Sequence, residues 1–153
     1  MGMVLQASLL EEVVDLLGQG RSLDRLGLEQ RVRELDISEA SVERYLGGAD
    51  SASPRKIIAR NELMECMFRE WPSGSEMSFS ARNRNEVVRV LSGKLTLTEQ
   101  YCAKGRMEPY CMTALIAGSV VSLPENLFYK IQNRQRDAAR TLHFVRPPRG
   151  GTR

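Results

Sequence analysis

Three side chains in the second half of the chain have the types needed for proton transfer: the His143 imidazole, the Glu86 carboxylate and the Tyr129 phenol. His143 is the only histidine and lies in an apolar run, LHFV. An imidazole titrates near neutral pH and can serve as a general acid or base. Glu86 can act as a base if it is desolvated, because burial raises the pKa of a carboxyl group. Tyr129 can donate a proton or orient a ligand.

Each of these residues also has a structural interpretation. His143 can be a half-buried histidine that makes one structural hydrogen bond, and Tyr129 can be an aromatic side chain that fills space in a core. Glu86 can form a salt bridge to Arg60 or Arg82. The residue types alone leave both interpretations open.

Helices are predicted to precede these residues. Apolar residues at helical spacing indicate an amphipathic helix over 4–17 and a second helix over 22–35, with Ser22 as its N-cap. Asp36 and Glu39 have capping-box spacing before a third, short helix that ends at a Gly-Gly pair.

The pattern changes after Pro54, where short runs of β-forming residues alternate with turn signals and indicate an all-β sandwich or barrel. We therefore expect one domain with a helical segment over 1–50 that packs on a β-barrel over 54–148, and a disordered tail over 149–153. The predicted strands are 56–60, 63–71, 86–91, 94–101, 109–116, 119–123, 128–133 and 140–146.

Two turns are specific enough to predict individually. Ser92-Gly93 joins EVVRVL to KLTLTEQ as a tight hairpin, in which glycine supplies the positive φ that the turn requires. A second turn is predicted at Pro124-Glu125-Asn126, between two strands of the stretch Gly118–Asn133.

Composition argues against nucleic-acid and membrane partners. The net charge is only +3, and basic residues are interspersed with acidic ones, so no continuous basic stripe is present. The segment LDISEASVERYLGG faintly resembles a DNA-reading helix pair, and we interpret it as a helical cap on the barrel. No apolar run is long enough to span a bilayer.

The three cysteines, Cys66, Cys102 and Cys111, form no CxxC pair and are odd in number, which argues against a disulfide framework or a zinc site. They are expected to be reduced thiols rather than nucleophiles. The first residues, MGMVLQASLLEEVV, lack the basic start of a secretory signal. The sequence thus predicts a cytoplasmic protein.

Two stretches together resemble the two motifs of the cupin superfamily. In Phe79–Gly93 the spacing from Phe79 through Glu86 to Gly93 fits the first motif. In Gly118–Asn133 the spacing from Gly118 to Pro124, Asn126, Tyr129 and Asn133 fits the second. The resemblance implies a mainly β fold, a cupin barrel (double-stranded β-helix or jelly roll) with two to three N-terminal helices.

Within that superfamily the chain resembles the thiol dioxygenases of the cysteine dioxygenase type. The segment IARNEL is similar to the one that carries the family's substrate-carboxylate arginine, which implies that role for Arg60. The run FREWPSGSEMS resembles the strand and turn that lead into the first motif. TLHFVRPP resembles the last strand, in which His143 matches a histidine and Val145 replaces a tyrosine, both near substrate.

The chain departs from that branch at the metal. The family binds iron through three histidines, and the corresponding positions here are Phe79, Ala81 and Tyr129. Phenylalanine and alanine offer no lone pair, and a tyrosine phenol is protonated at neutral pH. We therefore expect no metal cofactor, with Phe79 and Ala81 lining a substrate pocket instead.

Three functions follow from this resemblance. The first is a metal-free cupin that binds a small, carboxylate-bearing molecule and uses His143, Tyr129 and Glu86 for isomerisation, dehydration or cyclisation. The second is a non-catalytic ligand-binding or protein-interaction pseudoenzyme. The third is a thiol dioxygenase with an atypical metal site. The sequence leaves the oligomeric state and the identity of the ligand open.

Overall fold

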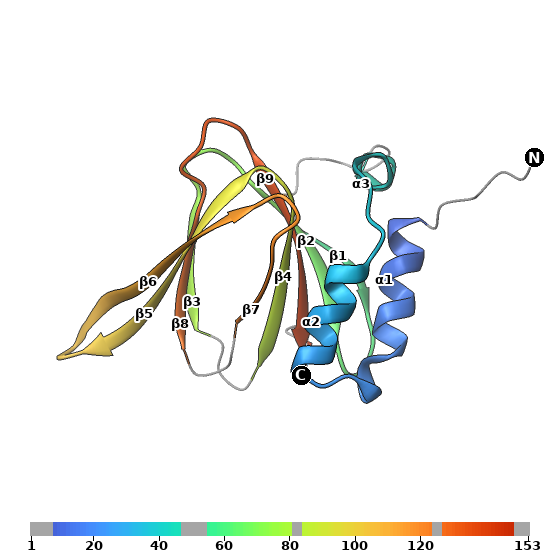
Figure 1. The fold of residues 1–153 in the computed structure, drawn as a ribbon, viewed down its shortest axis with the longest axis horizontal. Helices are drawn as coiled ribbons and strands as arrows, with labels where there is room; N and C mark the ends of the chain where they lie inside the picture. Colours follow the sequence, from blue (N-terminus) through green and yellow to red (C-terminus); the bar gives the residue numbers. More distant parts are fainter. Residues whose placement is uncertain (1–7, 47–54, 81–83, 124–126, 149–153) are drawn as a thin grey trace, which may run out of the picture.

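The structure, a computed structural model, describes residues 8–46, 55–80, 84–123 and 127–148. The helices lie together on one side of the strands, and the β5–β6 hairpin projects from the other side (Figure 1). The helices are α1 (Leu9–Gly18), the short 3-10 helix η1 (Gly20–Ser22), α2 (Arg25–Glu34) and α3 (Glu39–Leu46). The strands are β1 (Arg55–Arg60), β2 (Glu65–Trp71), β3 (Glu76–Ser80), β4 (Asn85–Ser92), β5 (Lys94–Ala103), β6 (Arg106–Ile116), β7 (Val120–Leu123), β8 (Phe128–Gln132) and β9 (Ala139–Arg146).

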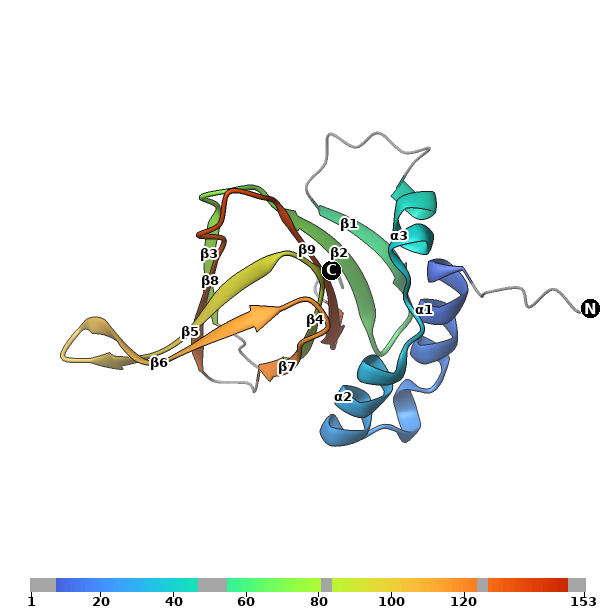
Figure 2. The ribbon, with the colours of Figure 1, turned by 45° about the horizontal axis from the view of Figure 1, so that its top comes forward.

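The strands form two antiparallel sheets that face each other as a barrel (Figure 2). The five-stranded sheet has the order β1-β2-β9-β4-β7, and the four-stranded sheet has the order β3-β8-β5-β6. The last strand, β9, is central because it pairs with both β2 and β4. The predicted mainly β fold, a jelly-roll barrel with N-terminal helices, is confirmed.

Two apolar cores share the five-stranded sheet. One core joins the helices to the outer face of this sheet, where Leu16 and Val32 belong to the same cluster as Phe144. The other fills the barrel interior around Val88 and Ile131. Because side chains alternate along a strand, β9 presents Leu142 and Phe144 to the helices, and it presents Thr141, His143 and Val145 to the interior. Both faces of β9 are therefore buried.

The N-cap of α2 is Asp24 rather than the predicted Ser22. The Asp24 carboxylate accepts a hydrogen bond of 2.7 Å from the Gly27 amide. Ser22 lies inside η1, and its hydroxyl donates to the Gln19 carbonyl instead. The predicted helix thus starts too early, because the 3-10 helix precedes it.

The start of α3 also differs from the prediction. Helix α3 begins at Glu39, and the Ser38 hydroxyl accepts a hydrogen bond of 3.0 Å from the Ser41 amide. Asp36 instead donates its backbone amide to Glu12. The capping-box spacing of Asp36 and Glu39 is therefore not used.

The hairpin at Gly93 is as predicted, since β4 ends at Ser92, β5 begins at Lys94 and the φ of Gly93 is +81°. Strand β3 was not predicted; it pairs with β8 and has only half-buried and exposed residues. The turn at 124–126, the Gly-Gly pair after α3, Ala81 and the tail lie outside the described residues. In the part of the chain that the structure describes, no helix is long and apolar enough to cross a membrane.

Candidate functional site

Four side chains form a continuous hydrogen-bonded chain inside the barrel, here called the interior polar chain. His143 Nδ1 lies 2.6 Å from Glu86 Oε2, and His143 Nε2 lies 2.7 Å from Thr141 Oγ1. The Trp71 indole N–H donates to Thr141 Oγ1 over 2.9 Å. Strands β2, β4 and β9 therefore position a carboxylate, an imidazole, a hydroxyl and an indole in series.

Strand register explains this alignment. Thr141, His143 and Val145 alternate along β9, so all three side chains point to the interior. Val145 pairs with Glu86 of β4, two residue pairs along the strands from the His143–Val88 pair. The Glu86 side chain therefore reaches His143 diagonally across two neighbouring strands.

The hydrogens of the chain can be assigned from its chemistry. An indole N–H only donates, so Thr141 Oγ1 accepts from Trp71. The Thr141 hydroxyl then donates to His143 Nε2, and His143 Nδ1–H donates to the Glu86 carboxylate. This arrangement gives each polar hydrogen one acceptor. Among the described residues, no buried side-chain nitrogen or oxygen lacks a hydrogen-bond partner.

A row of residues crosses the five-stranded sheet at the end of the barrel where Glu86 lies, here called the end row. Its members are backbone partners in the order Arg60, Glu65, Val145, Glu86 and Leu123. Glu65 is the first residue of β2 and Arg60 is the last residue of β1, so the row lies where these strands begin and end. Glu86 is consequently the member of the interior polar chain closest to this end.

The end row brings three predicted site residues together and adds one that was missed. Arg60, Val145 and Glu86 were predicted to belong to the site, and Glu65 was not. Glu65 is 2% exposed and lies on the other side of Val145 from Glu86. A glutamate in the otherwise apolar run MECMF is the sequence signal that could have identified it. Unlike its neighbours, Arg60 is exposed, and it forms no salt bridge to any other described residue.

The facing sheet contributes Phe79 and Tyr129, which are backbone partners in β3 and β8. Their ring centroids lie 5.7 Å apart, and Tyr129 is fully buried. Burial, and then the negative charge of Glu99, raises the pKa of the Tyr129 phenol well above its usual value. Tyr129 therefore stays protonated at neutral pH and can donate a hydrogen bond.

Phe79 and Tyr129, the described residues that the sequence resemblance aligns with iron-binding histidines, do not fit an iron site with three imidazoles. The Phe79 ring has no lone pair, and the Tyr129 phenol is held in its protonated form. Within the described ranges, no three histidine, cysteine, aspartate or glutamate residues converge as a metal site would require. Glu86 and His143 instead bond to each other.

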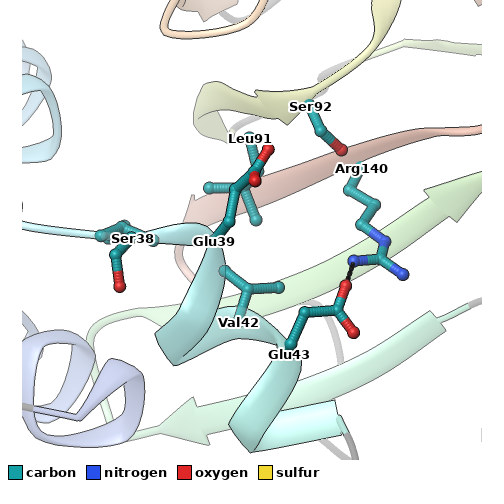
Figure 3. Close-up of a pocket in the computed structure, with 8 residues that line it drawn as sticks. Ser38, Glu39, Val42, Glu43, Leu91, Ser92 and Arg140 are labelled. Atoms are coloured by element: carbon teal, nitrogen blue, oxygen red, sulfur yellow. Dashed lines mark hydrogen bonds and ion pairs between the residues drawn. The ribbon is translucent and has the colours of Figure 1, made fainter.

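A separate pocket of about 180 Å³ lies outside the barrel, between α3 and the ends of β4 and β9 (Figure 3). Arg140 pairs there with Glu43 of α3 and with Glu70 of β2. Together with Val42 and Leu91, these ion pairs connect α3 to the sheet, so we interpret the pocket as part of the helix–barrel contact. Its lining residues are Ile37, Ser38, Glu39, Val42, Glu43, Leu91, Ser92 and Arg140.

Comparison with solved structures shows that this architecture is similar to the fold of cupin domains. No protein-family model and no curated protein matches the sequence. The cupin domain of Schizosaccharomyces pombe Cnp3 is 17% identical with a TM-score of 0.52, over 60% of this chain and 59% of that chain. BH2720 from Bacillus halodurans is 9% identical with a TM-score of 0.60, over 75% of this chain and 83% of that chain. A conserved Klebsiella pneumoniae protein with a double-stranded β-helix domain is 18% identical with a TM-score of 0.51, over 77% and 95% of the two chains.

These similarities show the fold, which is the cupin double-stranded β-helix. Identities of this size carry no information about ligand or reaction. The match to the fission-yeast domain spans less than two thirds of that chain. Function must therefore be argued from the side chains of this protein.

Proposed function

We propose that this cupin binds a small, carboxylate-bearing molecule at the end row of its barrel and acts on it by proton transfer without a metal ion. In this proposal the protein is a metal-independent relative of the cysteine dioxygenase-like branch. The observation that carries the proposal is the 2.6 Å hydrogen bond between His143 and Glu86 inside the barrel. A carboxylate paired with an imidazole in this way is a common acid–base unit.

The end row provides a division of roles. Arg60 is exposed at one side of the row and would bind the ligand carboxylate through its guanidinium fork. Glu86 lies three strands away, a backbone separation of about 14 Å at ordinary strand spacing. Because the arginine side chain covers part of this distance, a short-chain acid can bridge the remainder.

Proton transfer would then occur at Glu86. Glu86 takes a proton from a carbon of the ligand. His143 orients the Glu86 carboxylate and donates a hydrogen bond to it. The Tyr129 phenol on the facing sheet stays protonated because burial raises its pKa, and in this proposal it protonates an oxygen on which negative charge develops. Isomerisation, dehydration and cyclisation all use this combination of one base and one acid.

Hydrogen–deuterium exchange at carbon tests the proposal. The purified protein is incubated in D2O with short-chain hydroxy- and oxo-acids, and loss of C–H signals is followed by proton NMR. We expect catalysed exchange for at least one acid and a loss of about 100-fold or more in Glu86→Gln. Arg60→Ala should raise the half-saturating acid concentration by about 10-fold or more, because a charged hydrogen bond is lost.

Arg44→Ala is the matched control, since Arg44 is also exposed but lies on α3. It should leave the exchange unchanged. Exchange that persists in Glu86→Gln would rule out the assigned base. Iron bound near stoichiometrically to the purified protein, with oxygen uptake on cysteine, would contradict the metal-independent reaction and favour a thiol dioxygenase.

A non-catalytic binding module is the second candidate, and one observation favours it. His143 is fully buried, and its Nε2 is already bonded to Thr141. A network that is satisfied in this way can serve the core alone. Acids that raise the melting temperature through Arg60, yet show no carbon exchange, would identify this function.

The proposed compartment is the cytoplasm. Cys66, Cys102 and Cys111 are all free thiols. Reduced cysteines are the usual state in a reducing compartment.

A further inference from the structure

A second cavity lies on the four-stranded sheet, on the face that points away from the barrel interior. The described helices pack on the other sheet and leave this face uncovered (Figures 1 and 2). The cavity is a groove of about 340 Å³ across β3, β8 and β5, here called the outer groove. Small-molecule sites usually have volumes of about 300–1,000 Å³, so the outer groove is large enough to hold a ligand.

Strand register gathers the side chains of the outer groove in two rows. Ser78 of β3 pairs with Lys130 of β8. One step along the same face, Ser80 pairs with Phe128, and Phe128 pairs on its other side with Gln100 of β5. At ordinary strand spacing the groove measures about 10 Å across the three strands and about 7 Å along them. These dimensions suit a molecule of one or two small rings.

The outer groove is distinct from the interior polar chain. Phe79 and Tyr129 also border it, but both side chains belong to the packing of the barrel interior. Because side chains alternate along a strand, the residues on either side of Phe79 and Tyr129 face outward. The four-stranded sheet therefore separates the outer groove from His143 and Glu86.

A β-bulge shapes one wall of the outer groove. The pairing of β5 with β6 shifts between Glu99 and Gln100, and a bulge of this kind bends the strands and increases their twist. Beyond the bulge, Met107 of β6 pairs with Cys102, which lies on the same face of β5 as Gln100. Met107 lines the groove and is 42% exposed. The far part of the hairpin thus adds an apolar wall beside the polar rows.

Several polar groups of the outer groove are available to a ligand. Within the described ranges, the side chains of Ser78, Ser80 and Gln100 form no hydrogen bond to another residue. A serine hydroxyl both donates and accepts, and a glutamine amide offers two donor hydrogens and an acceptor oxygen. The groove therefore presents donors and acceptors side by side.

The charge of the outer groove is balanced. Among its described lining residues only Lys130 is charged, and its Nζ lies 3.1 Å from Glu76 Oε2. Phosphate and carboxylate ligands are usually held by charged donors that are free to pair with them. A neutralised lysine beside hydroxyl and amide groups favours an uncharged, hydrogen-bonding ligand instead.

We propose that the outer groove binds a neutral carbohydrate. A sugar ring carries hydroxyl groups around its rim, which match the Ser78, Ser80 and Gln100 side chains in donating and accepting. Its faces are formed by C–H groups, which pack on an aromatic ring such as Phe128 and on the flexible Met107 thioether. The Lys130–Glu76 pair adds one further donor and one further acceptor.

The affinity follows from the open, solvent-accessible form of the site. A few hydrogen bonds and one aromatic contact leave a small surplus after the cost of association, so we expect a dissociation constant on the order of 1 mM for a mono- or disaccharide. A site of this strength would hold a polysaccharide more tightly if several copies of the protein bound along it.

The first experiment measures binding by NMR on the full, isotope-labelled chain. Glucose, galactose, N-acetylglucosamine, maltose and cellobiose are titrated separately, and backbone amide shifts are followed. At least one sugar should bind and shift amides of β3, β8 and β5, including those of Ser80 and Gln100. Cosedimentation with starch and cellulose then distinguishes a free sugar from one in a polymer. No shift with any sugar at about 20 mM would overturn the proposal, as would shifts centred on His143.

The second experiment uses variants of the outer groove. Gln100→Ala and Phe128→Leu should each weaken binding by about 5-fold, since one loses an amide and the other loses the aromatic ring. Phe128→Tyr retains a ring and should bind like the parent chain. Ile116→Ala is the matched control, because Ile116 is 59% exposed on the same sheet but lies outside the groove. Unchanged affinity in both Gln100→Ala and Phe128→Leu would contradict the assigned site.

The third experiment tests the charge argument with glucuronate, which has the ring of glucose and one carboxylate. The parent chain should bind glucuronate no more tightly than glucose. Glu76→Gln releases Lys130 from its ion pair and should shift the preference toward glucuronate by about 3-fold, the size expected of an exposed charge pair. A parent chain that prefers glucuronate by about 10-fold or more would show that the groove is an anion site and would overturn the proposal.

Discussion

At the residue scale, the interior polar chain explains how a glutamate and a histidine remain inside an apolar barrel. Glu86 and His143 are 2% and 0% exposed, and burial of such groups is costly unless each hydrogen bond is made. The Trp71 indole and the Thr141 hydroxyl satisfy the far end of the chain. The interior polar chain therefore depends on Trp71 and Thr141, the two members that have no proposed part in proton transfer.

This dependence gives a prediction about Trp71 and Thr141. Trp71→Phe removes the indole donor and Thr141→Val removes the hydroxyl, and each change should cost about 1–3 kcal/mol because a buried partner is left unsatisfied. The double variant should cost less than the sum by about 1 kcal/mol, since the shared hydrogen bond is lost only once. Urea denaturation of the four proteins measures this coupling.

Thr96→Val is the control for the loss of a threonine hydroxyl on a strand, because Thr96 is half-buried on β5. It should change the free energy of unfolding by less than Thr141→Val does. Strict additivity of Trp71→Phe and Thr141→Val would show that the 2.9 Å contact contributes nothing to stability.

At the element scale, Ser22 and Asp24 are two candidate N-caps of α2 that lie only two positions apart. Asp24 bonds the Gly27 amide, whereas Ser22 bonds the preceding turn. An N-cap side chain satisfies an amide that would otherwise lack a partner, and its negative charge also interacts favourably with the helix dipole.

We therefore predict that Asp24→Ala lowers the free energy of unfolding by about 1 kcal/mol. Ser22→Ala should cost only a few tenths of that amount, because its hydroxyl makes one exposed hydrogen bond. Thermal denaturation of both variants provides the comparison. An equal or larger effect of Ser22→Ala would indicate that the helix begins earlier than the structure shows.

Local patterns in the sequence predicted the elements better than their boundaries. The Gly93 hairpin follows from local chemistry, and a Cβ added there would lie 2.8 Å from the Ala139 Cα atom. Strand β3 escaped prediction because its residues are half-buried or exposed, so it lacks an apolar run. The cap of α2 was missed because the sequence does not distinguish a 3-10 turn from the first turn of an α-helix.

The site was predictable only in part, for a different reason. Arg60, Glu86 and Val145 were identified through family resemblance, and the structure places them in one row because β1, β4 and β9 lie in the same sheet. Glu65 belongs to that row but matches no motif. The hydrogen bonds from Trp71 to Thr141 and from His143 to Glu86 depend on strand pairing over long sequence separations, which residue spacing cannot predict.

At the scale of the whole molecule, the helices and the outer face of the five-stranded sheet share one of the two apolar cores. Arg89 of β4 donates to the carbonyls of Val32 and Leu35, at the end of α2. Arg146 of β9 donates to the Leu23 carbonyl, just before that helix. Cys66 of β2 is fully buried in the cluster that joins the helices to the sheet. The helical layer should therefore unfold together with the barrel.

Cys66 reports on this cooperativity. Burial, and then the negative charge of Glu65, raises the pKa of the Cys66 thiol well above its usual value. In the native protein a disulfide reagent should modify the exposed Cys102 and Cys111 rapidly, and Cys66 only as fast as the molecule unfolds. Reaction of Cys66 before the circular dichroism signal of the barrel is lost would show that the helices detach independently.

The same thiol predicts an alkaline loss of stability. Because the folded pKa is raised, the stabilisation is complete below the pKa of the unfolded thiol, about 8.5. Above that pH the unfolded chain releases the proton and the folded chain retains it, so the free energy of unfolding falls by up to about 1.4 kcal/mol per pH unit. Urea denaturation between about pH 8 and pH 10 should show this slope in the parent chain and a shallower one in Cys66→Ala. Equal slopes would mean that Cys66 is accessible to solvent in the native state. The core between the helices and the five-stranded sheet would then not exclude water from this thiol.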